Sequence, residues 1–198
     1  MTFLDNGPLV LHENPFALTR TAANPTDAAL FASPITRMLL SSDGLTTTLL
    51  ESATGLRTHV RDARHDRVPA DAAPTGAAEL LQVTAQDELI VRRSTTAAVD
   101  GRVLASNQVV ARTDVPGAER CLTDGTAPLG LALHAAGTGF RRTVLHVGRR
   151  AWHPDPGRPP AAFKTYLIWH HDIPAVAISE LFNPEFVPAD RTPPGAAR

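Results

Sequence analysis

Hydrophobic and polar residues alternate most regularly in the middle of the chain and near its end. Residues Glu88 to Ala98 and Val103 to Thr113 are rich in Val, Ile, Leu and Thr, and Asp100-Gly101 between them favours a tight turn. This pattern predicts a β-hairpin. A second hairpin of the same character is predicted from Ala161 to His170 and from Ala175 to Phe182, around Asp172 to Pro174.

The segment before the first hairpin predicts a short helix at Ser33-Pro34. A serine hydroxyl caps the free amides of a first turn, and proline at the first helical position loses no hydrogen bond. The apolar residues expected to share the buried face of this helix are Ile35, Met38 and Leu39.

A second short helix is predicted from Leu45 to Thr54. Asp43-Gly44 separates it from the first helix, and Gly55 ends it. Its buried residues are expected to be Leu45 and Leu49. We therefore expect a helix, a tight turn and a second helix ahead of the strands.

The remaining segments complete an α+β pattern. A strand is expected where Leu56, Thr58 and Val60 alternate with polar residues, and a loop over 66–76 separates it from the first hairpin. After that hairpin we expect two short helices, over 116–122 and 128–135, and then a strand over 140–147. Five or six mostly antiparallel strands with short helices on one face make an α+β fold.

Length and composition predict a single soluble domain of 198 residues. We expect an N-terminal extension over 1–32, a core over 34–188 and a flexible tail over 189–198. A net charge of −1 disfavours nucleic acid as a partner. The sequence contains neither a membrane-spanning run nor a signal peptide, so we expect a cytoplasmic protein. We expect it to be a monomer or a small homo-oligomer.

No metal or cofactor is expected from the motifs. Cys121 is the single cysteine and is expected to be a buried apolar residue, while His170 and His171 are adjacent in a strand and diverge from one another. No phosphate-binding glycine loop and no GxSxG nucleophile motif occurs. The partner expected from this balance is a small molecule.

Charged residues inside apolar strands are the candidates for chemistry, because an unpaired buried charge is costly. Glu180 interrupts an apolar run, and Arg92 and Arg93 interrupt another. Adjacent strand residues point to opposite faces, so only one arginine can enter a shared cavity. A structural ion pair, or a solvated position on an edge strand, is an equally open interpretation of these residues.

The order of several short motifs resembles the chorismate lyase family over roughly residues 34 to 188. These motifs are Leu39-Leu40 with Asp43-Gly44-Leu45, Ile90-Val91-Arg92-Arg93, Asp100-Gly101, Pro128-Leu129-Gly130, Val147-Gly148-Arg149, and Glu180-Leu181-Phe182-Asn183-Pro184. The resemblance implies a six-stranded antiparallel sheet with an enclosed site beneath two helix-turn flaps. It also implies release of pyruvate from chorismate to give 4-hydroxybenzoate, without metal or cofactor.

The resemblance assigns roles to named residues. It implies that Arg92 binds the ring carboxylate, with help from the backbone amides of Leu45 and of Leu129 in Pro128-Leu129-Gly130, and that Glu180 contacts the hydroxyl at the opposite end of the ring. Counting back from the Asp100-Gly101 turn would select Arg93 instead, but we prefer Arg92. Chorismate carries a second carboxylate, for which Lys164 and Arg142 are the candidate cations.

Two other functions stay open at this point. A related enzyme could form a different aromatic acid, such as 3-hydroxybenzoate or an aminobenzoate. The effector-binding module of GntR-type transcription regulators shares this fold, so a non-catalytic ligand-binding domain is the second possibility. About 30 residues precede the first matched helix, which is too few for a winged helix-turn-helix, so we expect such a domain to stand alone.

Overall fold

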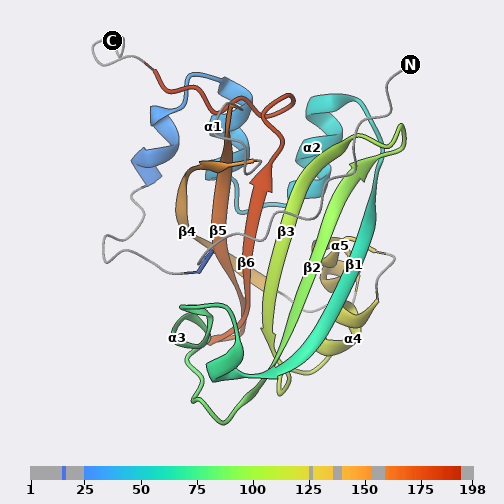
Figure 1. Cartoon of the computed structure of the whole chain (residues 1–198), viewed down its shortest axis with the longest axis vertical. Coiled ribbons are helices and arrows are strands. Elements are labelled where there is room, and N and C mark those ends of the chain that lie inside the picture. Colours follow the sequence, from blue (N-terminus) through green and yellow to red (C-terminus); the bar gives the residue numbers. More distant parts are fainter. Residues whose placement is uncertain (1–14, 17–24, 125–126, 136–139, 153–158, 193–198) are drawn as a thin grey trace.

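Six antiparallel strands form one sheet in the order β1-β2-β3-β6-β5-β4 (Figure 1). This computed structural model describes residues 15–16, 25–124, 127–135, 140–152 and 159–192. The strands are β1 (Thr58–Pro69), β2 (Glu88–Ala98), β3 (Val103–Arg112), β4 (Phe140–Ala151), β5 (Pro160–His170) and β6 (Ile173–Phe182). The predicted α+β class and antiparallel sheet are confirmed.

Both predicted hairpins are present. β2 and β3 pair with Arg92 opposite Val109, and Gly101 adopts the left-handed φ of 88° in the turn between them. β5 and β6 pair with Lys164 opposite Glu180. The two hairpins join in the middle of the sheet through the pairing of β3 with β6, so the most buried strands of the chain are neighbours.

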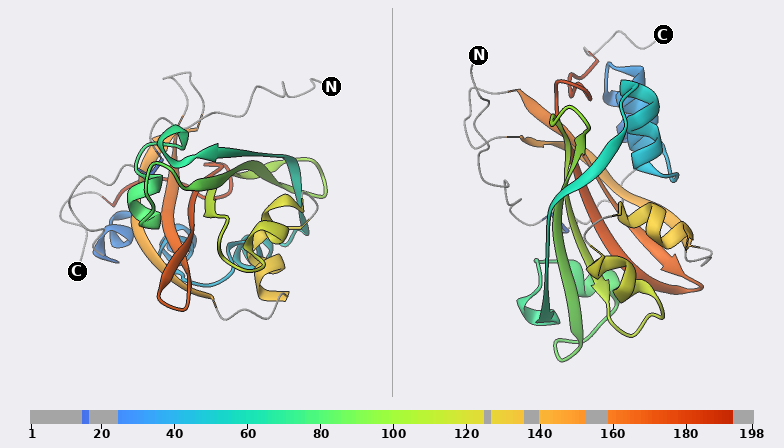
Figure 2. Two further views of the ribbon diagram at one scale, coloured as in Figure 1. Left: turned by 90° about the horizontal axis from the view of Figure 1, so that it is seen from below. Right: turned by 90° about the vertical axis from the view of Figure 1, so that its right-hand side faces the viewer.

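Four short helices lie on one face of the sheet (Figure 2). They are α1 (Pro34–Ser41), α2 (Thr46–Thr54), α4 (Ala118–Thr123) and α5 (Leu129–Ala135), preceded by the 3-10 helix η1 (Pro25–Leu30). The 3-10 helix η2 (Ala70–Ala72) and α3 (Ala77–Leu81) pack against the opposite face, where Phe16 is fully buried.

The caps of α1 and α2 are as predicted, but the buried faces are not. Ser33 caps α1 by accepting a hydrogen bond from the Thr36 amide, and Gly55 ends α2 in the left-handed conformation. The exposed side of α1 carries Ile35 and Met38, which is 63% exposed. On the buried side, the hydroxyl of Thr36 donates to the Pro188 carbonyl at 2.7 Å.

The residues that α1 buries are therefore Thr36, Leu39 and Leu40, and those that α2 buries are Thr46 and Leu50, while Leu45 and Leu49 are half-buried.

Two strands are longer than predicted, and one helix was missed. β1 runs on to Pro69 and η2 follows over Ala70–Ala72, so most of the predicted loop over 66–76 belongs to regular structure, and the missed helix α3 begins at Ala77. β4 continues to Ala151, beyond the predicted end at Val147. Both strands are edges of the sheet, where polar residues can point to either side, and the alternation of residue types is lost there.

Some expectations concern residues outside the described parts of the chain. They include most of the proposed N-terminal extension, the end of the proposed flexible tail at 193–198 and the proline-rich loop over 153–158. Within the described residues, no helix is long and apolar enough to cross a membrane. Cys121 belongs to α4 and is buried in the cluster that joins α4 to α5, as expected.

Candidate functional site

A partly enclosed pocket of about 50 Å³ lies between the sheet and the helices. Two segments cover it. The first flap, residues 42–47, leads from α1 into the first turn of α2, and the second flap, residues 127–130, leads into the first turn of α5. The lining comprises Leu45, Thr46, Thr47, Val60, Arg92, Ser94, Thr96, Asn107, Val109, Pro128, Leu129, Gly130, Arg142, Tyr166, Ile178 and Glu180.

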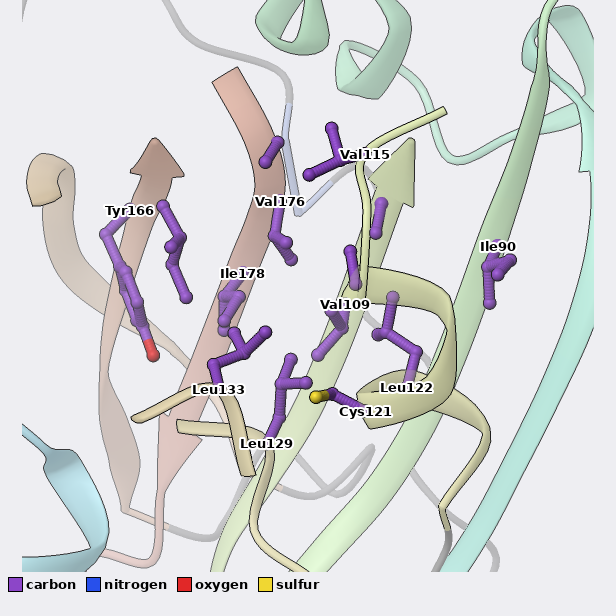
Figure 3. Close-up of a cluster of buried hydrophobic side chains, with 14 residues drawn as sticks. Ile90, Val109, Val115, Cys121, Leu122, Leu129, Leu133, Tyr166, Val176 and Ile178 are labelled. Atoms are coloured by element: carbon purple, nitrogen blue, oxygen red, sulfur yellow. The ribbon is translucent and has the colours of Figure 1, made fainter. Parts of the chain in front are cut away.

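An apolar cluster holds the second flap on the sheet (Figure 3). Leu129 and Leu133 of α5 pack with Cys121 of α4 against Val109 and Ile178 of the central strands. This packing fixes the position of the second flap at one side of the pocket. The polar lining residues are therefore held against a closely packed apolar wall.

Strand register explains how residues distant in sequence reach this pocket. Ser94, Asn107, Glu180 and Lys164 are directly opposed on β2, β3, β6 and β5, so they form one row on the helix-covered face. A neighbouring row on the same face contains Arg92, Val109, Ile178, Tyr166 and Val144. Arg92 and Glu180 thus belong to the same face, two strands apart.

Arg92 enters the pocket, and its side chain is only 2% exposed. Its terminal nitrogens donate to main-chain oxygens, of Cys121 at 3.5 Å and Ala127 at 3.3 Å. Its Nε has no hydrogen-bond partner among the described residues. Burial lowers the pKa of Arg92, and the negative charge of Asp124 partly opposes this shift.

Arg93 lies on the opposite face of the sheet. It pairs across the strands with Arg64 on one side and Gln108 on the other, and it is not among the residues that line the pocket. The two adjacent arginines therefore have different surroundings, and the preferred one, Arg92, is the one that lines the same pocket as Glu180.

Glu180 belongs to a buried polar group at the other end of the pocket. The hydroxyl of Thr46 donates to Glu180 Oε2 at 2.8 Å, and Lys164 Nζ donates to the same hydroxyl oxygen at 3.2 Å. Lys164 Nζ lies 3.8 Å from Glu180 Oε2. An ion pair of Glu180 is thus present, but its partner is Lys164 and not one of the two arginines of β2.

Lys164 also holds the first flap. Its ammonium donates to the main-chain oxygens of Leu39 at 3.1 Å and Ser42 at 3.4 Å. Burial lowers the pKa of Lys164, and the carboxylate of Glu180 partly opposes this. Although the sequence suggested Lys164 as a ligand-binding cation, it is 1% exposed and lies behind Glu180, outside the lining of the pocket.

The other four candidates line the pocket at the flaps. Leu45 belongs to the first flap, Leu129 and Gly130 to the second, and Arg142 reaches the pocket from β4. Among the described residues, no acceptor is present for the backbone N–H of Leu45 or of Leu129. The pocket thus gathers six of the seven candidate residues, all except Lys164.

Six polar residues that line the pocket were not identified from the sequence: Thr46, Thr47, Ser94, Thr96, Asn107 and Tyr166. Thr46 connects Lys164 to Glu180, but a threonine after an Asp-Gly turn carries no distinctive signal. Asn107 lies directly opposite Glu180, a relation that only the strand register reveals. Tyr166 is the single tyrosine of the chain, and its position in a buried strand could have indicated it. Burial, and then the charge of Glu180, raise the pKa of Tyr166 well above its ordinary value.

Comparison with known proteins places the fold. No protein-family model and no curated protein sequence matches this chain. Among solved structures, PhnF from Mycobacterium smegmatis matches with a TM-score of 0.58 and 16% identity over 73% of this chain and 66% of the PhnF chain. This chain therefore spans slightly under two thirds of that PhnF chain.

Two isolated domains match over more of their own length. The effector domain of the same PhnF has a TM-score of 0.54 and 16% identity, covering 73% of this chain and 91% of that domain. The C-terminal domain of the histidine utilization repressor from Pseudomonas syringae pv. tomato str. DC3000 has a TM-score of 0.53 and 11% identity, covering 72% and 100%.

These matches define a chorismate-lyase-like α+β fold of the kind found in the effector domains of GntR-type regulators. At this level of identity the likeness concerns the fold alone. The fold that the resemblance to the lyase family implied is thus present. A likeness of fold does not by itself assign the lyase activity to this chain.

Proposed function

We propose that this protein binds a small organic acid in the pocket between the two flaps and the sheet. The observation that carries this proposal is the buried guanidinium of Arg92, whose acceptors among the described residues are neutral carbonyls and whose Nε has none. A buried cation is best compensated by an anion that forms charge-assisted hydrogen bonds. A ligand carboxylate meets this need.

The far end of the pocket favours a ligand with a second polar group. Strand spacings of about 4.8 Å and rises of about 3.4 Å place the backbones of Arg92 and Glu180 roughly 12 Å apart. Both side chains extend from the same face of the sheet, so their polar ends are separated by a distance of this order, which suits one six-membered ring with a polar group at each end. Glu180 accepts hydrogen bonds, so a ring hydroxyl opposite the carboxylate is the group we infer there.

The fold is consistent with binding alone. The PhnF effector domain and the C-terminal domain of the histidine repressor belong to regulators, and their likeness to this chain supports a ligand-binding module as the first candidate function. A ring acid such as 4-hydroxybenzoate would then be the ligand and not the product.

Chorismate lyase is the second candidate, and a specific observation favours it. The positions that the lyase resemblance assigns, Arg92, Glu180, Leu45 and Leu129, all line one pocket. In this reaction the bond between C3 and the ether oxygen of the enolpyruvyl group breaks, C4 loses its hydrogen, and pyruvate and 4-hydroxybenzoate result. Arg92 would hold the ring carboxylate, and Glu180 would orient the C4 hydroxyl in a site poor in water.

One experiment tests both functions. Isothermal titration with 4-hydroxybenzoate measures binding, and incubation with chorismate followed by chromatography and a pyruvate assay measures turnover. We expect binding by the wild type and a loss of at least ~10-fold in affinity for Arg92→Ala, because a charge-assisted hydrogen bond contributes about 1.5–3 kcal/mol. Arg93→Ala is the matched control, since Arg93 lies on the opposite face.

The outcomes separate the candidates. Equal yields of pyruvate and 4-hydroxybenzoate establish the lyase, and another aromatic product establishes a related enzyme. Binding without turnover establishes the ligand-binding module. If neither compound binds, or if Arg93→Ala weakens binding more than Arg92→Ala does, the proposed placement of the carboxylate is wrong.

A further inference from the structure

Arg142 lies between the two flaps of the pocket. It extends from the edge strand β4, and its Nη1 donates to the main-chain oxygen of Asp43 in the first flap at 3.3 Å. On the other side, a Cβ atom built on Gly130 of the second flap would be 3.3 Å from Arg142 Nη2. The guanidinium of Arg142 thus contacts both flaps of the pocket.

The absence of a side chain at residue 130 allows this approach. The same built Cβ would also lie 3.1 Å from Leu45 Cδ2, which is tighter than an ordinary contact. Leu45, Gly130 and Arg142 therefore meet at one point, where the first flap, the second flap and the sheet edge converge. A ligand held near this point would contact all three.

The guanidinium of Arg142 has one edge in use and one edge available. Nη1 is occupied by the Asp43 carbonyl, whereas Nε is buried and has no hydrogen-bond partner among the described residues. Nε and Nη2 form the side-on edge of an arginine, and this edge binds a carboxylate through two parallel hydrogen bonds. Within the described part of the chain, Arg142 forms no salt bridge that would occupy this edge.

Lys164, the other candidate cation near this end of the pocket, is already committed to the fold. Its ammonium donates to the oxygens of Leu39, Ser42 and Thr46, and it contacts Glu180 from behind. An ammonium has three protons, so no donor remains for a ligand. This leaves Arg142 as the cation of the flaps that can accept an additional anion.

We propose that Arg142 binds a second carboxylate of the ligand, so that the pocket has a higher affinity for ring compounds with two carboxylates than for those with one. This inference rests on the proposed function, in which Arg92 binds the first carboxylate. The second carboxylate takes the Nε/Nη2 edge of Arg142 while Nη1 keeps the first flap in place. Recognition of the second group and the position of the first flap therefore depend on the same side chain.

The test compares two stable ring ligands that differ only in one charge. The first is 3-(carboxymethoxy)-4-hydroxybenzoate, which has two carboxylates. The second is 3-(carbamoylmethoxy)-4-hydroxybenzoate, in which a neutral amide replaces the side-chain carboxylate. By isothermal titration we expect the wild type to prefer the first ligand by ~10-fold or more. Arg142→Gln should bind both ligands within about twofold of each other, because a neutral amide cannot form the charged pair.

The matched control is Arg141→Gln. Arg141 is exposed, and its guanidinium stacks 4.7 Å from the ring centre of Trp169. This variant should keep the full preference. If circular dichroism shows that Arg142→Gln is unfolded, Arg142→Lys replaces it: this variant keeps the charge but loses the two-point edge, and at least ~3-fold of the preference should disappear.

Each result decides a separate point. A wild type that binds both ligands equally overturns the inference and leaves the proposed function intact. An Arg142→Gln variant that keeps the preference also overturns it. A wild type that binds neither ligand, and does not bind 4-hydroxybenzoate, refutes the proposed function together with this inference.

Discussion

Replacing Lys164 with methionine is the sharpest test of the buried polar group behind the pocket. The change keeps a long unbranched side chain, so the cavity it creates is small. It removes the ammonium that neutralises Glu180 and that binds the main-chain oxygens of Leu39 and Ser42 in front of α2. Both partners are buried, with Lys164 1% and Glu180 8% exposed, so water replaces the lost interactions poorly.

The magnitude follows from what remains in the variant. Glu180 keeps only its hydrogen bond from Thr46 and must either stay charged without a cation or take up a proton. Protonating an ordinary glutamate costs about 4 kcal/mol at pH 7 and about 1 kcal/mol at pH 5, which sets a ceiling on the charge effect. The two main-chain oxygens that lose their donor each lower the stability of the variant by about 1 kcal/mol. Part of this loss is offset, because the variant no longer has to bury an ammonium away from water.

We therefore expect Lys164→Met to lower the free energy of unfolding by ~3 kcal/mol at pH 7, or about 6–12 °C in Tm, and by about 1 kcal/mol at pH 5. A second effect has the same direction. The pKa of Lys164 is lowered in the folded protein, so the unfolded chain holds more protons between the two pKa values, and wild-type stability rises with pH over that range. The deficit of the variant should therefore grow steadily with pH.

Urea unfolding followed by circular dichroism at pH 5 and pH 7.5 measures the effect of the uncompensated carboxylate, and the same measurement at pH 9.5 measures the effect of Lys164. The double variant Lys164→Met/Glu180→Gln should recover much of the loss at pH 7.5, because it removes the uncompensated carboxylate. Arg102→Met, which breaks an exposed pair with Asp100, should leave the urea midpoint unchanged. A deficit below about 1 kcal/mol at pH 7.5, or one that is the same at both pH values, would refute the reasoning.

Three further predictions concern packing and reactivity. Gly148→Ala should lower stability by about 1–3 kcal/mol in urea unfolding, because its Cβ would lie 2.7 Å from Cε1 of the Phe163 ring; an unchanged midpoint would mean that the ring moves aside freely. Phe16→Ala should cost about 3–5 kcal/mol, measured in the same way, since Phe16 is fully buried on the face opposite the pocket, and a cost under about 1 kcal/mol would contradict that position. Burial raises the pKa of the Cys121 thiol, so we expect its alkylation at pH 8 to be much slower in the native protein than in urea, and equal rates would contradict its burial.

The sequence by itself determined the elements whose signals are local. The hairpin around Asp100-Gly101 follows from strand alternation and turn chemistry, and both appear within a few residues. The ends of α1 and α2 at Ser33 and Gly55 follow from capping, which involves only the first or last turn of a helix. The sequence also marked Arg92 and Glu180, because a charged residue in an apolar strand is visible without any knowledge of its neighbours.

The tertiary structure alone decided how these elements rotate and which residues meet. The inward face of α1 carries Thr36, Leu39 and Leu40, and its contacts come from distant segments, including the Pro188 carbonyl that accepts from Thr36. The roles of Lys164 and Arg142 could not be separated by sequence, because both are cations in strands. One became a structural partner of Glu180, and the other reached the flaps, because neighbouring strands and turns from distant segments surround each of them differently. Local propensities fix an element, whereas the surroundings of a side chain depend on contacts made across the whole fold.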